Sequence, residues 1–253
     1  DDLRASDELR VVIYGAYDAG KSTLLKRLLI EAGTGVPEWL TISARRETFD
    51  TKEIPSGGIV FVDTPGLGSG NNDHDQLTLD ALKLADAYLW VLPPQLVTSN
   101  KEIFVDFLSG RYFSDSLPAS VVAGSTVAVV AQMEEAGIDP ADNLDGFRKL
   151  VQRKVAELEL MLRDDRIEAK LHAICCVVAD PYQSGQNHPN PDREIYDVGR
   201  EWDGVKELAE SLEALRSERE TLRDGAGARF VSALARVARD ELKDEVTELR
   251  LSL

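Results

Sequence analysis

Short apolar runs alternate with amphipathic stretches along most of the chain. The runs rich in Val, Ile and Leu predict buried strands at residues 9–14, 59–62, 87–92, 125–131 and 171–179. Apolar residues at helical spacing predict helices at residues 21–32, 77–85, 102–108, 144–170 and 205–222. A weaker alternation predicts one more strand at 48–54, ended by a turn at 55–58. Strands that alternate with helices predict an α/β fold, in which a mostly parallel central sheet carries helices on both faces.

The last part of the chain has a different pattern. Residues 182–192 are rich in Gly, Asn, Gln and Pro and predict a loop. Asp224, Gly225 and Gly227 predict an interruption in the helical pattern, after which apolar residues line one side of a helix from 228 to 253. We therefore expect a main domain over residues 1–223 and a C-terminal helical extension over residues 224–253.

Residues 15–22 match the phosphate-loop pattern GxxxxGK[ST] without a mismatch. Its glycines let backbone N–H groups surround phosphate oxygens, and the following helix points the positive end of its dipole at the same anion. Lys21 places a cation on the β- and γ-phosphates, and the Ser22 hydroxyl is a hard ligand for Mg²⁺. A chance match is the alternative, but a buried strand before the pattern and an amphipathic helix after it favour a nucleotide site. The residues expected to contact the nucleotide here are Gly15, Tyr17, Asp18, Ala19, Gly20, Lys21, Ser22 and Thr23.

A second motif, Asp63-Thr64-Pro65-Gly66, ends the strand predicted at 59–62. A carboxylate in this place can hold Mg²⁺ through a water molecule. The Gly66 N–H can donate to the γ-phosphate, so loss of that phosphate releases the following loop. An ordinary Asp-Pro-Gly turn is the alternative. After a phosphate loop we expect Asp63 to be a metal ligand and Gly66 to be a contact of the γ-phosphate.

Composition limits the partners of the protein. The 253 residues are 43% hydrophobic, which suffices for one large domain with a helical appendage. The formal net charge is -16. A strongly acidic surface repels phosphate backbones and anionic lipids, so we expect no nucleic-acid partner and no broad adhesion to membranes through this fragment.

The two cysteines bear on the cellular compartment of the protein. Cys175 and Cys176 are adjacent in an apolar run, where a bridge between them would be strained, so we expect both to be reduced and buried, as in a cytoplasmic protein. No apolar stretch has the length of a membrane span. The chain begins with Asp1 rather than Met and ends in a predicted helix, so we expect a piece of a longer protein, whose membrane contacts stay unknown.

GAYDAGKST at 15–23, DTPGL at 63–67 and ADAYLWVL at 85–92 together resemble the translation-factor-related P-loop GTPases, within them the dynamin-like and Era-like branches. WDGVKELAESL at 202–212 is similar to the closing helix of such domains. The resemblance implies a three-layer P-loop NTPase fold that binds GTP or GDP with Mg²⁺. The helices beyond it would begin a helical bundle, as in dynamin-like proteins, and the domain would form a nucleotide-dependent homodimer.

The resemblance also bears on catalysis. Leu67 stands where Ras-like GTPases have the Gln that orients the attacking water, which implies another catalytic group. Dynamin-like proteins have Ser at the position of Asp18, and several cation-dependent relatives have Asn. We hypothesise that Asp18 supports K⁺ or Na⁺ beside the phosphates; capping of the loop is the alternative. One switch threonine should bind Mg²⁺, and of Thr41, Thr48 and Thr51 we favour Thr41, whose stretch has the composition of an irregular loop.

The guanine-reading motif [NT]KxD is replaced by Gln-Met-Glu-Glu. By resemblance, Gln132 takes the Asn role and Glu135 aligns with the Asp that binds the guanine ring. Met133 replaces the Lys and can cover a base face by apolar contact. Ala179 and Asp180 occupy the place of the Ser-Ala-type loop, where the Ala179 N–H would donate to the base.

These features predict Mg²⁺-dependent hydrolysis of GTP to GDP and phosphate, which drives conformational change or dimerisation. An ATP-using or base-unspecific NTPase stays open because the base motif departs from the family pattern. A pseudo-GTPase scaffold is a further alternative, although decayed sites usually lose residues such as Lys21, Ser22 and Asp63, which are intact here.

Overall fold

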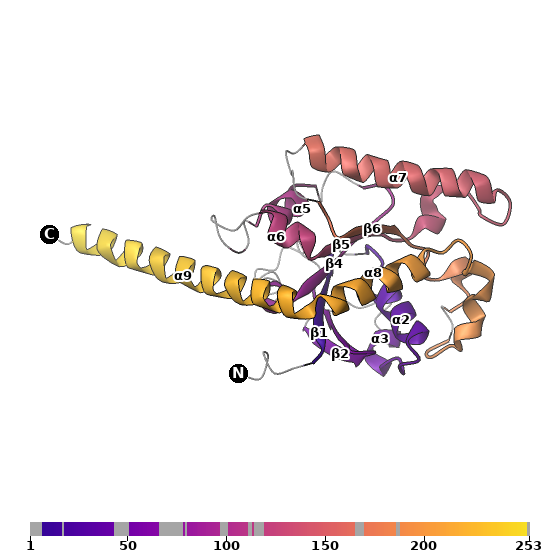
Figure 1. Ribbon diagram of the computed structural model, residues 1–253, viewed down its shortest axis with the longest axis horizontal. Coiled ribbons are helices and arrows are strands. Elements are labelled where there is room, and N and C mark those ends of the chain that lie inside the picture. Colours follow the sequence, from indigo (N-terminus) through magenta and orange to yellow (C-terminus); the bar gives the residue numbers. More distant parts are fainter. Residues whose placement is uncertain are drawn as a thin grey trace.

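A six-stranded sheet forms the centre of the molecule (Figure 1). The computed structural model describes residues 7–16, 18–42, 51–65, 78, 80–96, 101–110, 113, 119–164, 170–185 and 188–251. The strand order is β2-β3-β1-β4-β5-β6, and all neighbours are parallel except β2 and β3. The strands are β1 Leu9–Gly15, β2 Lys52–Ser56, β3 Ile59–Asp63, β4 Ala87–Leu92, β5 Thr126–Val130 and β6 Ala173–Cys176. The predicted α/β class with a mostly parallel sheet is confirmed.

Helices connect the strands and continue beyond the last of them. The α-helices are α2 Lys21–Glu31, α3 Glu38–Ile42, α5 Lys101–Leu108, α6 Ala119–Gly124, α7 Leu144–Asp164, α8 Val205–Ser217 and α9 Arg219–Leu251. The described residues also form three shorter 3₁₀ segments: η3 Met133–Ala136, η4 Pro181–Gln183 and η5 Arg193–Gly199. Two of these, η4 and η5, give structure to the region around the loop predicted at 182–192. Residues 78 and 80–84 are also helical, as predicted.

The alternation of side chains along the buried strands builds two apolar layers. In β1, Val11 and Ile13 pack on one face of the sheet with residues of α2 and α8. Val12 and Tyr14 pack on the other face with residues of α5, α6 and α7. Figure 1 shows α2 and α3 on the opposite side of the sheet from α7. The fold therefore has the three predicted layers.

The hairpin at the edge of the sheet differs from the prediction. Pro55 was expected in a turn, but it lies within β2, and the turn consists of Gly57 and Gly58 with φ angles of 58° and 81°. A proline lacks the N–H of a ladder hydrogen bond, and an edge strand tolerates this loss. The edge position of β2 is a property of the sheet and is invisible in the local sequence.

The cysteines have the predicted environment. Cys175 and Cys176 are buried free thiols, and they pack into different apolar clusters because neighbouring strand residues face opposite sides of the sheet. Strand β6 is shorter than the run at 171–179, although the Val177 N–H still donates to the Val130 carbonyl at 2.8 Å.

The two C-terminal helices meet at a different place from the one predicted. The break lies at Glu218, and α9 passes through Gly225 and Gly227 without interruption. The predicted interruption at 224–227 was therefore wrong. Helix α9 extends away from the body of the molecule (Figure 1). No described helix combines the length and the hydrophobicity needed to cross a membrane.

Candidate functional site

The loop between β1 and α2 needs glycine at two positions. A Cβ atom on Gly15 would lie 2.3 Å from the carbonyl oxygen of Val91, because β1 and β4 pair at this point. Gly20 has a φ of 89°, in the left-handed region that favours glycine. Asp18 also has a positive φ of 63°. The loop thus curls back toward the end of β1, and its amides precede the first turn of α2.

Lys21 extends across the mouth of this loop. Its Nζ donates to the carbonyl oxygens of Gly15 at 3.1 Å and Ala16 at 2.8 Å. Burial lowers the pKa of Lys21, while the carboxylates of Asp63 and Asp18 act to raise it. The ammonium group therefore lies at the loop, where it can exchange its carbonyl partners for phosphate oxygens.

The pairing of β3 with β1 places Asp63 beside the phosphate loop. It is the last residue of β3 and pairs with Ile13 of β1, and its side chain is fully buried. The neighbouring Thr64 hydroxyl donates to the Ile13 carbonyl at 3.0 Å, which fixes the end of β3 against β1. Ser22 lies in the first turn of α2.

These residues fit the magnesium ion that the phosphate-loop pattern implies. A hydroxyl from Ser22 and a carboxylate from Asp63 are the hard oxygen donors that Mg²⁺ prefers. The described residues contain no cluster of three or more His, Cys, Asp or Glu side chains suited to a metal. A Mg²⁺ ion that keeps several waters and takes phosphate oxygens needs only a few protein ligands, so this sparse set suits it.

Gln132 meets the phosphate loop from the end of β5. Its Nε2 donates to the Asp18 carbonyl at 3.2 Å, and its Cγ would lie 3.3 Å from a Cβ on Gly20. Its φ of 54° turns the chain into η3. The following Met133 has no exposed surface and packs with Phe147. The expectation that Met133 covers a base was wrong, because its apolar side chain completes the core instead.

Acidic residues lie beside Gln132. Glu134 and Glu135 are exposed residues of η3. The surrounding protein raises the pKa of Glu134 by desolvation, and the charges of Glu135 and Asp180 raise it further. Of these two neighbouring carboxylates, the sequence predicted a role for Glu135 only. One oxygen of Asp180 accepts from the Gly185 N–H at 2.7 Å, and Ala179 is 5% exposed.

Some of the remaining predicted residues lie in the described part of the chain, and the others lie outside it. Thr41 lies in the short helix α3, so the expected irregular stretch was wrong, and its side chain is outside the described part. Thr51 directly precedes β2, Thr23 is exposed in the first turn of α2, and Ala19 is buried. The predictions for Tyr17, Thr48, Gly66 and Leu67 fall outside the described residues.

Comparisons with known proteins agree with this geometry. Residues 10–118 match the family model of the 50S ribosome-binding GTPase. No curated protein matches the sequence. Among solved structures, LeoA, a bacterial dynamin GTPase from ETEC, is 18% identical with a TM-score of 0.56; the match covers 94% of this chain and 40% of LeoA.

Two further structures are less similar. The bacterial selenocysteine-specific elongation factor EF-Sec is 19% identical with a TM-score of 0.45, over 81% of this chain and 29% of that protein. Era from Aquifex aeolicus is 22% identical with a TM-score of 0.40, over 67% of this chain and 50% of Era. The chain thus spans half or less of the length of each of these proteins. Residues 10–118 of this chain thus match a GTPase family model, and its fold is similar to that of LeoA.

Proposed function

We propose that the protein binds GTP with Mg²⁺ and hydrolyses it to GDP and phosphate. The observation that carries this proposal is the position of Lys21, whose ammonium group lies on the carbonyls of Gly15 and Ala16 beside the buried Asp63. An ammonium group, a loop of backbone amides and a buried carboxylate at the end of a parallel strand are the parts that phosphoryl transfer needs.

Each part has a proposed task. The amides from Gly15 to Thr23, those of Tyr17 and Ala19 included, bind the phosphate oxygens, and Lys21 neutralises charge on the β- and γ-phosphates. Ser22 and Asp63 hold Mg²⁺, with Thr41 as the third protein ligand. When bound, Mg²⁺ stabilises the negative charge that develops on the transferred phosphoryl group. The Gly66 N–H contacts the γ-phosphate and transmits its loss to the next loop.

Asp18 is proposed to support a K⁺ or Na⁺ ion. It is exposed at a positive φ on the phosphate loop, and its charge acts on Lys21. A monovalent cation there would stabilise charge between the β- and γ-phosphates. Equal hydrolysis rates in K⁺ and in a large inert cation at constant ionic strength would rule this role out.

Guanine recognition is assigned to the residues around η3. Gln132 supports the base side of the loop through its bond to Asp18, Glu135 accepts from the guanine ring, and the backbone of Ala179 and Asp180 borders the base. A base-unspecific NTPase is the second candidate, and a specific observation favours it: Met133 is buried, so it leaves one face of the base without the cover that the family's lysine provides.

The experiment that tests the proposal measures both binding and turnover. We expect Lys21→Ala to weaken binding of a fluorescent GTP analogue about 10- to 100-fold, because a charge-assisted contact is lost. Hydrolysis should fall about 100-fold or more. The matched control is Lys243→Ala, an exposed lysine of α9 that should leave both quantities unchanged.

Competition of GTP and ATP with the fluorescent analogue distinguishes a GTPase from a base-unspecific NTPase. If GTP displaces the analogue much better than ATP does, the site reads guanine; equal displacement supports the unspecific NTPase. Binding without hydrolysis in the parent protein supports a pseudo-GTPase scaffold. Absence of binding by any purine triphosphate at millimolar concentration contradicts all three.

The wider role is proposed by analogy with LeoA, whose name describes a bacterial dynamin. The GTPase domain would form a homodimer when nucleotide is bound, and α9 would carry the movement outward. Light scattering with and without a non-hydrolysable GTP analogue tests the dimer. The buried free thiols suit a cytoplasmic location.

A further inference from the structure

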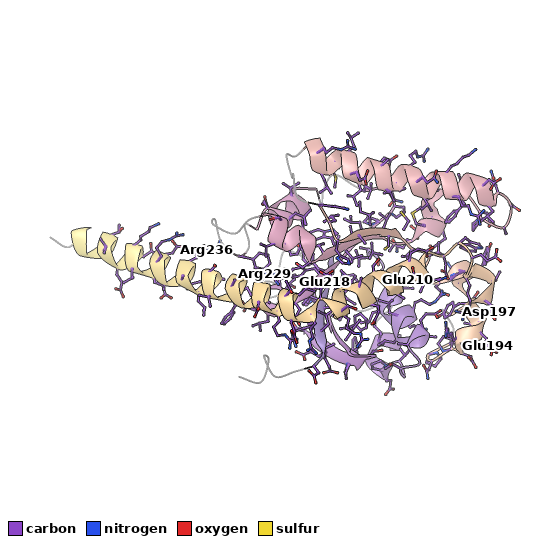
Figure 2. The ribbon with its side chains drawn as sticks, in the orientation of Figure 1. Glu194, Asp197, Glu210, Glu218, Arg229 and Arg236 are labelled. Carbon is purple, nitrogen blue, oxygen red and sulfur yellow. The ribbon has the colours of Figure 1, made fainter. Side chains whose placement is uncertain are left out.

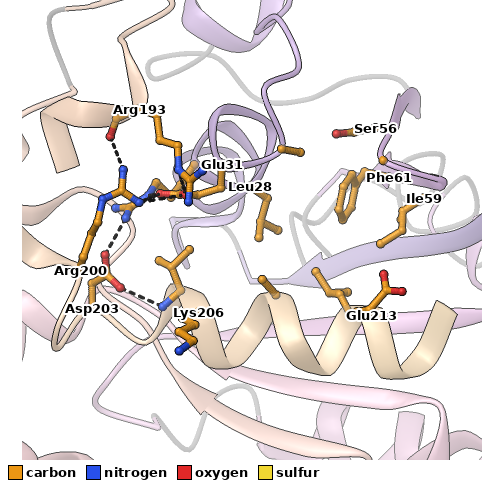
Figure 3. Close-up of a pocket in the computed structure, with 16 residues that line it drawn as sticks. Leu28, Glu31, Ser56, Ile59, Phe61, Arg193, Arg200, Asp203, Lys206 and Glu213 are labelled. Atoms are coloured by element: carbon orange, nitrogen blue, oxygen red, sulfur yellow. Dashed lines mark hydrogen bonds and ion pairs between the residues drawn. The ribbon is translucent and has the colours of Figure 1, made fainter. Parts of the chain in front are cut away.

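A cavity of about 400 Å³ opens between α2, the β2–β3 hairpin, η5 and α8 (Figure 3). This volume lies in the range of small-molecule sites, about 300–1,000 Å³. The cavity lies at the C-terminal end of α2, about 15 Å along the helix from the phosphate loop. None of the described phosphate-loop residues lines it.

The floor of the cavity is apolar. It is lined by Leu28 of α2, Ile59 and Phe61 of β3, and Val205 and Leu212 of α8, each 8% exposed or less. Such a surface gains free energy when an apolar group displaces water from it. The floor therefore suits the hydrocarbon part of a ligand.

One end of the cavity is charged. Figure 3 shows Arg193, Arg200 and Glu31 together at the end opposite Ile59 and Phe61. The Glu31 carboxylate forms an ion pair with the Nε atom of Arg193 at 2.7 Å and accepts hydrogen bonds from Arg200 at 3.2 Å. The Arg200 guanidinium also contacts the Asp197 carboxylate and the Arg193 carbonyl, so its three nitrogens are all engaged.

Arg193 has hydrogen-bond donors that are available to a ligand. Its two terminal amino groups have no hydrogen-bond partner among the described residues, and its side chain is 59% exposed. The other acidic groups of the lining are engaged: Asp203 pairs with the buried Arg27 at 2.6 Å, and Glu213 pairs with Arg216 at 2.6 Å. A cationic fork is thus available in a protein with a net charge of -16.

We propose that this cavity is a second ligand site, which takes a small amphipathic anion. Its hydrocarbon part lies on Leu28, Phe61 and Leu212, and its anionic group accepts two hydrogen bonds from the terminal amino groups of Arg193. A planar guanidinium matches a carboxylate or a phosphate in this bidentate way. Lys206, also in the lining and 79% exposed, pairs with Glu210 at 3.9 Å, so the anion is assigned to Arg193 alone.

The site is joined to the nucleotide site by two elements. Helix α2 runs from Lys21 to the cavity, and β3 runs from Ile59 and Phe61 in the cavity to Asp63. Ligand binding is nevertheless independent of the GTPase proposal, so it is tested in the absence of nucleotide.

The test uses three probes with the same ten-carbon chain: decanoate, decyl phosphate and 1-decanol, below their micelle or solubility limits. Isothermal titration calorimetry should give one site per chain for decanoate, with tighter binding than for 1-decanol. Arg193→Gln should weaken decanoate binding about 10-fold and leave 1-decanol within 2-fold. The relative affinities of decanoate and decyl phosphate identify the preferred anionic group.

Two further variants complete the test. Ala209→Phe places a ring into the cavity from an exposed position of α8 and should abolish binding of all three probes. Arg153→Gln, on the exposed face of α7, should change nothing. Failure of decanoate to bind, unchanged binding by Arg193→Gln, or unchanged binding by Ala209→Phe would each overturn the proposal.

Discussion

At the scale of single residues, Glu31 has the densest set of charged contacts in the described structure outside the phosphate loop. It pairs with Arg27 of the same helix at 2.9 Å, and it joins α2 to the η5 region through Arg193 at 2.7 Å and Arg200 at 3.2 Å. Burial by itself raises the pKa of Glu31, but the hydrogen bond from Arg27 and the charges of Arg27, Arg200 and Arg193 outweigh it and lower the pKa. A lowered pKa means that the folded state favours the ionised carboxylate.

We therefore expect Glu31→Gln to destabilise the protein at pH 7 by about 1–3 kcal/mol. Since the folded-state pKa is depressed, the contribution of Glu31 is present above its unfolded-state pKa of about 4.3 and is lost as the pH falls below it. Urea unfolding at pH 7 and at pH 3.5 measures the difference. The stability gap between variant and parent should shrink at the lower pH.

The control for this prediction is Glu213→Gln. Glu213 forms a bidentate pair with Arg216 at the surface, where solvent screens the interaction. We expect no measurable loss of stability from this substitution. A gap at Glu31 that stays constant between the two pH values would contradict the role assigned to its charge.

At the scale of elements, the two glycines inside α9 lower the intrinsic stability of that helix. Gly227 lies in the helix interior, and a Cβ there would meet no atom within 4 Å. Glycine costs about 0.5–1 kcal/mol relative to alanine in such a position, because it loses more backbone entropy on folding. We expect Gly227→Ala to increase the helical content of α9 and to raise its resistance to unfolding by about that amount, measured by circular dichroism during denaturation.

A matched substitution at Gly57 distinguishes the effect of backbone conformation from the effect of the space available for a Cβ atom. Gly57 also has open space around a Cβ, but its φ is 58°. Gly57→Ala should destabilise the β2–β3 hairpin by about 1 kcal/mol, because a left-handed conformation is unfavourable for alanine. Equal effects of the two substitutions would show that conformation is not the cause.

At the scale of the whole molecule, the first turns of α9 are bound to the body. Arg223 donates to both oxygens of the buried Asp86, at 3.1 and 2.7 Å, and to the Glu8 carbonyl. Asp86 also accepts from the Arg10 N–H at 2.9 Å. Figure 2 shows Arg229 where α9 leaves the body and Arg236 farther along the helix. Movement of α9 relative to the body of the molecule therefore requires these contacts to break or to move as a unit.

We expect Arg223→Gln to increase amide hydrogen exchange over residues 219–229 by about 10-fold, because a charge-assisted pair with Asp86 is lost. Exchange in α2 and affinity for nucleotide should be unchanged, since Asp86 lies at the opposite end of the strands from the phosphate loop. Arg239→Gln, an exposed residue farther along α9, serves as the control. Unchanged exchange over 219–229 would show that Arg229 and apolar packing hold the helix without Arg223.

Local sequence is enough to predict the alternation of strands and helices, the phosphate loop and the place of Asp63 at the end of a buried strand. These follow from local periodicity and from a motif whose spacing is set by phosphate geometry. The same local reasoning failed at Pro55, at Gly225 and Gly227, and at Met133. In each case the outcome depends on neighbours distant in the chain or on the packing of the element as a whole.

The way in which separate segments come together in one site depends on the folded sheet. Gln132 reaches the phosphate loop only because β5 ends beside the loop in the folded sheet, and Glu31 meets Arg193 and Arg200 only because η5 folds back onto α2. These contacts join residues more than a hundred positions apart. A pattern of neighbouring residues holds no information on such pairs, because their proximity arises from the packing of whole elements against the sheet.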